Sequence, residues 1–196
     1  MSSSAARGFP VVLTALTVAA LAVLVSLGVW QLQRLAWKQE LIARIEAAQA
    51  ASPIPLEAAL ARRDPEFTRV TVICRGLDRA PWVSLNTLVE GRAGVRLVSV
   101  CPGQTPILVD RGFVIDTVSA RPPNDGGTMP VVVRGVLRRG DPANAFTPPP
   151  QGDNVFVRDI GLMADVLGAG DVRRDLMIVA ETSSNPEWGA LRPVAL

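Results

Sequence analysis

The sequence contains no histidine among its 196 residues. Histidine is the commonest catalytic base and the commonest ligand of zinc and haem iron. A Ser-His-Asp triad, a histidine-bearing metal site and a histidine-ligated haem therefore cannot be built from this chain alone. Nucleophile-elbow, P-loop and dinucleotide-binding motifs are also missing. The sequence predicts a protein that is not an enzyme.

Cysteine is scarce, with only Cys74 and Cys101. The two fall in separate predicted strands, and neither belongs to a Cys-x-x-Cys pair or to a cluster of other metal ligands. In an oxidising compartment they could form a disulfide, whereas two buried free thiols are the other interpretation. The sequence leaves these two states open and predicts no metal site.

Charged residues make up only 19% of the chain, and the net charge is +2. The arginines are scattered among nearly as many acidic residues, without the basic cluster or interleaved aromatics of a phosphate-binding surface. Nucleic acid is therefore not a predicted partner. Apolar residues reach 48%, which excludes disorder for most of the chain and suits one compact domain behind an anchor.

The longest feature is an uncharged run over residues 8–33. A helix of about 22 residues is about 33 Å long, enough to cross a hydrocarbon core of about 30 Å. We expect a cytoplasmic N-terminus at 1–8, a transmembrane helix at 9–32, a membrane-exit helix at 33–51, an extracytoplasmic domain at 52–182 and a tail at 183–196. A cleaved signal peptide is the rival interpretation, but its apolar region is usually shorter. Basic residues on both sides leave the orientation undecided.

The end of the apolar run carries tryptophans and basic residues at helical spacing. They share one side of the predicted exit helix, and we call them the exit stripe: Trp30, Gln31, Arg34, Trp37 and Lys38. Tryptophan suits the headgroup layer, and arginine and lysine can reach lipid phosphates. The stripe therefore predicts contacts either with membrane lipids or with a partner protein.

Seven runs of β-branched and aromatic residues follow, separated by turn formers. They predict strands at 67–75, 82–90, 95–101, 106–116, 129–138, 155–159 and 176–181. A short helix is expected after Pro55 and another at 161–167, and a loop at 91–94. With mostly short connections, the predicted class is α+β with β dominant, a largely antiparallel sheet closing into a barrel or sandwich.

A charged pair and a glycine interrupt the fourth run at Asp110, Arg111 and Gly112. Asp110 alternates with Val109, so we expect it to face solvent. One interpretation of Arg111 is a β-bulge, with the arginine pairing with a neighbouring acid. The other is a contact for an anionic group such as a carboxylate or a propionate, which suits the planar guanidinium.

Several motifs, taken in order, resemble the Surfeit locus protein 1 family, the assembly factors of haem-copper cytochrome c oxidase. The matching residues are Leu27-Gly28-Val29-Trp30-Gln31-Leu32-Gln33-Arg34-Leu35-Ala36-Trp37-Lys38, then Glu66-Phe67-Thr68-Arg69-Val70 with Gly76, then 108–114 and 154–159. Asp110 and Phe113 stand where the family usually has Asn and Trp. Family members usually continue past a sequence like 191–194 into an Asn-Asn-His element and a second membrane helix, so we expect either a truncated reading frame or action through protein contacts alone.

The resemblance implies a non-enzymatic role in inserting haem a into the oxidase, with subunit 1 or other assembly factors and membrane lipids as partners. Haem a is a possible cofactor by resemblance only, because this chain supplies no histidine ligand. The short N-terminus points to a bacterial inner membrane, and the family places the domain outside the cytoplasm. The alternative is a membrane-tethered adaptor of an envelope complex without a cofactor.

Overall fold

The computed structural model describes residues 11–194, apart from the side chains at 44, 45, 48 and 49. It divides into two units, Met1–Ala47 and Ala48–Leu196, which we take one at a time. The predicted N-terminus at 1–8 and the predicted first residues of the membrane helix lie outside the described residues.

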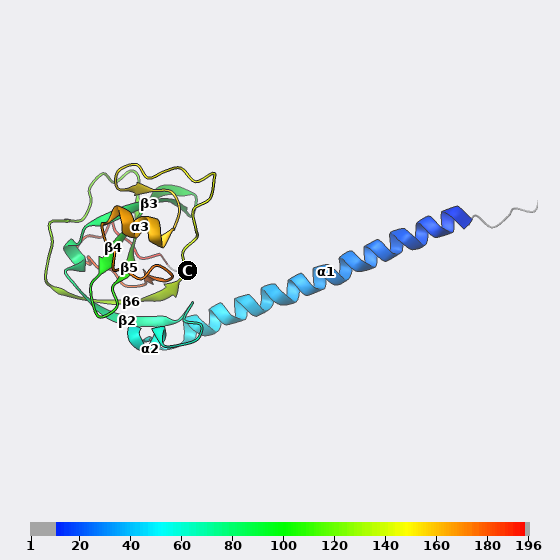
Figure 1. The fold of residues 1–196 in the computed structure, drawn as a ribbon, viewed down its shortest axis with the longest axis horizontal. Helices are drawn as coiled ribbons and strands as arrows, with labels where there is room; N and C mark the ends of the chain where they lie inside the picture. Colours follow the sequence, from blue (N-terminus) through cyan, green and yellow to red (C-terminus); the bar gives the residue numbers. More distant parts are fainter. Residues whose placement is uncertain (1–10, 195–196) are drawn as a thin grey trace, which may run out of the picture. The chain divides into compact units, whose positions relative to one another are not determined.

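The first unit is built on the helix α1, which runs unbroken over Val11–Ala50 (Figure 1). Its apolar segment Val11–Ala43 is long enough to cross a membrane, and its side chains are exposed. Thr17 and Ser26 donate their hydroxyl hydrogens to the carbonyls of Leu13 and Ala22, one turn back. These bonds satisfy the hydroxyls within the helix, as a hydrocarbon environment requires.

The second unit is one mixed sheet of eight strands in the order β1-β2-β6-β8-β5-β4-β3-β7. The strands are β1 (Ile54–Pro55), β2 (Arg69–Arg75), β3 (Trp82–Val89), β4 (Arg92–Cys101), β5 (Ile107–Ile115), β6 (Pro130–Arg138), β7 (Asn154–Val155) and β8 (Met177–Ala180). The helical elements are α2 (Leu56–Leu60), η1 (Leu77–Arg79) and α3 (Ile160–Val166). The predicted α+β class with β dominant is confirmed.

Antiparallel ladders join β2 to β6, β6 to β8, β5 to β4 and β4 to β3. Three parallel pairings add to them, between β1 and β2, β5 and β8, and β3 and β7. The loop expected at 91–94 is shorter than predicted and begins one residue earlier. Glu90 and Gly91 both have positive φ and form a two-residue hairpin turn between β3 and β4.

Cys74 of β2 and Cys101 of β4 form a disulfide, which settles the two states left open by the sequence. Three strands separate β2 from β4 in the sheet, so a flat sheet would hold them about 19 Å apart at the usual strand spacing of about 4.8 Å. Their Cα atoms are 5.0 Å apart. The sheet is therefore strongly rolled, with the disulfide on its concave side.

Apolar side chains cover both faces of the rolled sheet. On the concave side Val70, Val109 and Ile178 pack with the disulfide and with α2. On the convex side Leu108 and Met177 pack against α3. The central strands β5 and β8 are consequently buried on both faces, which is the usual cause of unbroken apolar runs in a strand.

Candidate functional site

The exit stripe occupies one side of α1. At about 100° per residue, its five members fall within an arc of about 120° on the helix surface. Trp30 is 49% exposed and Trp37 is 61% exposed. The guanidinium carbon of Arg34 lies 5.4 Å from the centre of the Trp30 ring, a cation–π contact that orients both side chains. The stripe is a preformed basic and aromatic surface, and its role in lipid or partner contact stays a prediction.

Arg111 lies at a β-bulge, as one of the two interpretations predicted. Opposite β4, Leu97 pairs with Gly112 and Val98 pairs with Asp110, which leaves Arg111 as the extra residue. Gly112 has φ 131°, and a Cβ atom there would lie 2.4 Å from the Arg192 carbonyl oxygen. Only glycine fits this combination of backbone conformation and close approach.

The Arg111 side chain is fully buried, and its guanidinium binds five acceptors. Nε donates to Ser184 Oγ at 3.0 Å, Nη1 to Ser99 Oγ at 3.2 Å and to the Ala80 carbonyl at 3.4 Å. Nη2 donates to the Asp78 carbonyl at 3.1 Å and to Asn185 Oδ1. All five N–H groups therefore have partners.

The prediction that Arg111 pairs with an acidic residue is wrong, because its five acceptors are hydroxyl, carbonyl and amide oxygens. Burial lowers the pKa of Arg111 to about 10, and the charge of Asp78 opposes that shift. The arginine thus remains charged at neutral pH. In this conformation it joins β5 to β4, to the η1 turn and to residues 184–185, and its role as an anion contact stays a prediction.

Asp110 is fully buried, so the prediction that it faces solvent is wrong. The reason is that the convex face of β5 is covered as well as the concave face. Its Oδ2 lies 2.6 Å from Arg96 Nε on β4, although the N–H does not point at it, and its Oδ1 accepts from the Gly112 amide at 3.1 Å. Burial raises the pKa of Asp110, and the nearby charge of Arg96 opposes the rise.

The donor set does not suit iron or zinc. The chain has no histidine, and both cysteines are in the disulfide. Within residues 11–194, no three cysteine or acidic side chains are grouped as a metal site. A pocket of about 260 Å³ lies beside α3, lined by Arg139, Gly140, Pro142, Asp159, Ile160, Arg174 and Asp175. Arg139, Asp159, Arg174 and Asp175 are the charged members of this lining, and the volume is below the range of about 300–1,000 Å³ typical of organic cofactor sites.

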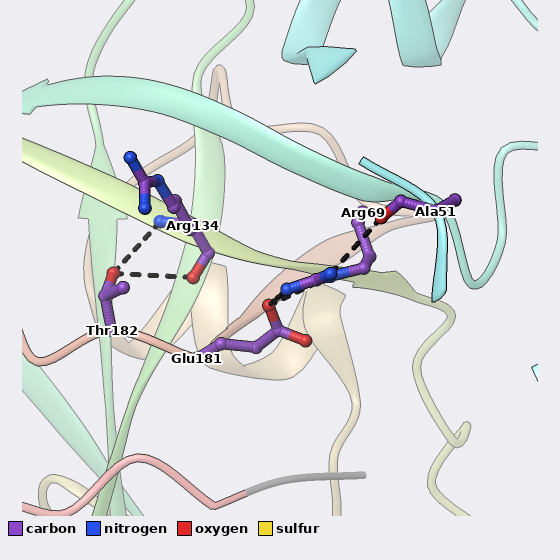
Figure 2. A network of polar contacts seen from close by, with 5 residues as sticks. All are labelled: Ala51, Arg69, Arg134, Glu181 and Thr182. Atoms are coloured by element: carbon purple, nitrogen blue, oxygen red, sulfur yellow. Dashed lines mark hydrogen bonds and ion pairs between the residues drawn. The ribbon is translucent and has the colours of Figure 1, made fainter. Parts of the chain in front are cut away.

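A second polar network lies where the chain enters the sheet unit (Figure 2). Arg69 of β2 donates to Glu181 Oε2 through Nε at 3.2 Å and Nη2 at 2.8 Å, and through Nη1 to the Ala51 carbonyl at 3.2 Å. Next to it, Thr182 Oγ1 accepts from the Arg134 backbone amide at 3.0 Å. The network ties the first residue after α1 to β2 and to the segment after β8.

Sequence reasoning missed most of these partners. Ser99, Ser184 and Asn185 come from distant parts of the chain, and none belongs to a recognisable motif. The Arg69–Glu181 pair spans 112 positions. The one local signal was the charged pair with glycine in an apolar strand, and that signal correctly marked the bulge.

Comparison with known proteins shows to which family this sequence is related. The SURF1 family matches residues 18–195, which covers most of α1 and all eight strands of the sheet. Surfeit locus protein 1 of Mus musculus is 30% identical over 190 residues, covering 85% of this chain and 61% of that protein. The Homo sapiens protein of that name is 28% identical over 194 residues, covering 85% and 63%. The chain thus spans about three fifths of the length of these relatives. This chain belongs to the SURF1 family.

Proposed function

We propose that this chain is a membrane-anchored assembly factor for haem-copper cytochrome c oxidase. The observation that carries the proposal is the family match, which is continuous from residue 18 to residue 195. It includes both the exit stripe on α1 and the rolled sheet. The known family role is cytochrome c oxidase assembly, and an anchored, non-enzymatic chain fits such a role.

The finer proposal is that the chain assists insertion of haem a into the catalytic subunit of the oxidase. The residues present do not fit ligation of the haem iron, because histidine is missing and the cysteines are oxidised. Arg111 is committed to the domain interior. The chain therefore acts by contacting the oxidase subunit that receives the haem, and the exit stripe is the contact surface.

We further propose that α1 lies in a bacterial inner membrane, with the sheet unit on its periplasmic side. The support is the disulfide between Cys74 and Cys101, because disulfides persist in oxidising compartments and are rare in the cytosol. The length and composition of Val11–Ala43 support the anchor.

The test is deletion of the gene, followed by reduced-minus-oxidised spectra of the membranes. We expect the haem a signal of the oxidase and its activity to fall, and to return when the wild-type gene is supplied. A variant with Trp30→Ala and Trp37→Ala should restore much less. Gln39→Ala is the matched control, since it lies on the opposite side of α1 and should restore fully.

Equal amounts of each variant in the membrane must first be verified by immunoblot. Unchanged oxidase haem after deletion would refute the assembly role. Recovery of envelope proteins without oxidase subunits, in pull-downs from detergent extracts, would favour the tethered adaptor instead. Full rescue by the double tryptophan variant would keep the assembly role but remove the exit stripe from it.

A further inference from the structure

The outward side of the β2–β6 ladder is apolar at its centre. On β2, Val70, Val72 and Cys74 point into the concave core, so the residues that alternate with them, Thr71, Ile73 and Arg75, point outward. Register then places the outward residues of β6 opposite them. We call this surface the β2–β6 outer face, and its members are Thr71, Ile73, Arg75, Pro130, Val132 and Arg134.

Two β-branched residues meet at the middle of this face. Ile73 pairs directly with Val132, and they are 59% and 52% exposed. Met129, one residue before β6, is 68% exposed. The water-facing side of an antiparallel pair normally carries polar residues, so a paired Ile and Val there indicate a surface that is covered in use.

The rim of the face is basic. Arg75 and Arg134 are exposed, and within residues 11–194 the structure gives neither guanidinium an ion pair. Figure 2 shows the Arg134 guanidinium pointing away from Thr182 and Glu181. Glu181, the acid next to this face, is bound by Arg69. The free charge of the face is therefore positive, which complements an anionic surface.

The start of β2 lies at the point where the chain enters the sheet unit. Ala51, the residue after α1, is held by Arg69 at the start of β2, and β1 pairs with β2 directly afterwards. The candidate membrane span ends at Ala43 and its uncharged run ends at Gln33, so the chain between the membrane segment and Ala51 is the remainder of α1. A short tether keeps the face at high effective concentration near a lipid surface, so even weak contacts are populated.

We propose that the β2–β6 outer face rests on the membrane, with Ile73 and Val132 at the interface and Arg75 and Arg134 on anionic lipid headgroups. This rests on the membrane anchorage proposed above but not on the role in oxidase assembly. Apolar side chains flanked by arginines, which can reach phosphates while their stems cover apolar surface, suit the headgroup boundary.

The test uses the full chain in nanodiscs of phosphatidylcholine alone or with about 30% phosphatidylglycerol. One variant carries Val132→Cys labelled with an environment-sensitive fluorophore under non-reducing conditions. The matched control carries the label at Leu88→Cys, another strongly exposed strand residue, on β3. Quenching by a spin-labelled lipid reports which label touches the bilayer.

We expect the label at position 132 to be quenched, more so with phosphatidylglycerol, and the label at position 88 to be unaffected. Adding Arg75→Glu and Arg134→Glu should lower the quenched fraction by roughly fivefold or more, because each cation at an anionic surface changes partition by about that factor. Equal quenching at both positions, or no quenching at 132 in a chain that co-elutes with nanodiscs, overturns the proposal. If the fluorophore at position 132 becomes shielded from water only after oxidase subunits are added, the face binds a protein partner, and the proposal of membrane contact is also overturned. A chain that does not co-elute refutes the anchorage itself.

Discussion

Arg111 shows how one residue can join several parts of a fold. It is a buried cation whose five N–H groups bind five neutral acceptors from three separate segments. Such an arrangement offsets much of the desolvation cost of the charge, and it makes each acceptor dependent on the arginine. Arg111 therefore couples β4, the η1 turn and residues 184–185 to β5.

Arg111→Met should destabilise the sheet unit by at least about 3 kcal/mol, because it leaves several buried acceptors unpaired. Arg111→Lys should restore only part of that loss, since an ammonium group cannot reproduce the planar fork. The measurement is urea unfolding of the detergent-solubilised chain, followed by tryptophan fluorescence.

Arg92→Met is the matched control, because Arg92 is exposed and its ion pair among the described residues is with exposed Glu90. A surface pair of this kind contributes at most about 1 kcal/mol. Equal stability of the Arg111 and Arg92 variants would show that the buried network contributes nothing.

Asp159 provides a pH-dependent test. As the N-cap of α3 it accepts from the amides of Leu162 and Ala143, both at 3.0 Å, and these hydrogen bonds lower the pKa of its carboxyl. A carboxyl whose pKa is lower in the folded state contributes stability above its unfolded pKa of about 3.9 and loses it as pH falls through the folded value.

We expect Asp159→Ala to cost about 1 kcal/mol at pH 7, the usual value of a lost N-cap. Asp159→Asn keeps one acceptor oxygen and should cost less. Unfolding curves should show that the difference in free energy of unfolding between wild type and Asp159→Asn becomes smaller from pH 6 to pH 3. A gap that stays constant over this range would mean that the charge of the carboxylate is not involved.

At the scale of elements, the sequence predicted the strands of four or more residues well, β8 (Met177–Ala180) included, and the two-residue strands poorly. The alternation of apolar and polar residues placed the strands now seen as β2 to β6 within about three residues of their observed ends. The helix expected after Pro55 is confirmed as α2, with Leu56 and Ala59 buried. The strand predicted at 155–159 shrinks to Asn154–Val155, because the chain then turns to let Asp159 cap α3.

The two-residue strand β1 and the turn η1 were not predicted. Neither carries a periodic pattern, and each exists because of a partner distant in sequence: β1 pairs with β2, and η1 carries carbonyls that accept from Arg111. The same reason applies to the three parallel pairings. Local propensity cannot specify pairings that are decided by the tertiary fold.

The bulge in β5 can be tested through its glycine. Gly112→Ala combines a positive φ with a Cβ placed 2.4 Å from a backbone oxygen, so we expect a loss of at least about 2 kcal/mol in the free energy of unfolding. Gly103→Ala is the control, because a Cβ there meets nothing within 4 Å. The control should be neutral or slightly stabilising. Similar effects of both changes would argue against the bulge geometry.

At the scale of the whole molecule, the rolled sheet depends on a contact that no local pattern reveals. The sequence left disulfide and free thiols open because strand spacing and order, not sequence distance, decide whether two cysteines meet. Their meeting across three intervening strands is a consequence of the roll. The disulfide in turn closes a segment of 27 residues along the chain.

In the loop-entropy description, closing a segment of this length stabilises the folded state by about 3.5 kcal/mol. We therefore expect Cys74→Ala with Cys101→Ala to lower the free energy of unfolding by about that amount, and a reductant to lower that of the wild type similarly. The same reductant should leave the stability of the double variant unchanged, which separates loss of the cross-link from loss of packing.

Maleimide labelling of unreduced chain taken from cells checks whether the disulfide is formed, because a disulfide formed outside the cytoplasm blocks both thiols. Rapid labelling of both cysteines would place the sheet unit in a reducing compartment and refute the periplasmic location together with the cross-link.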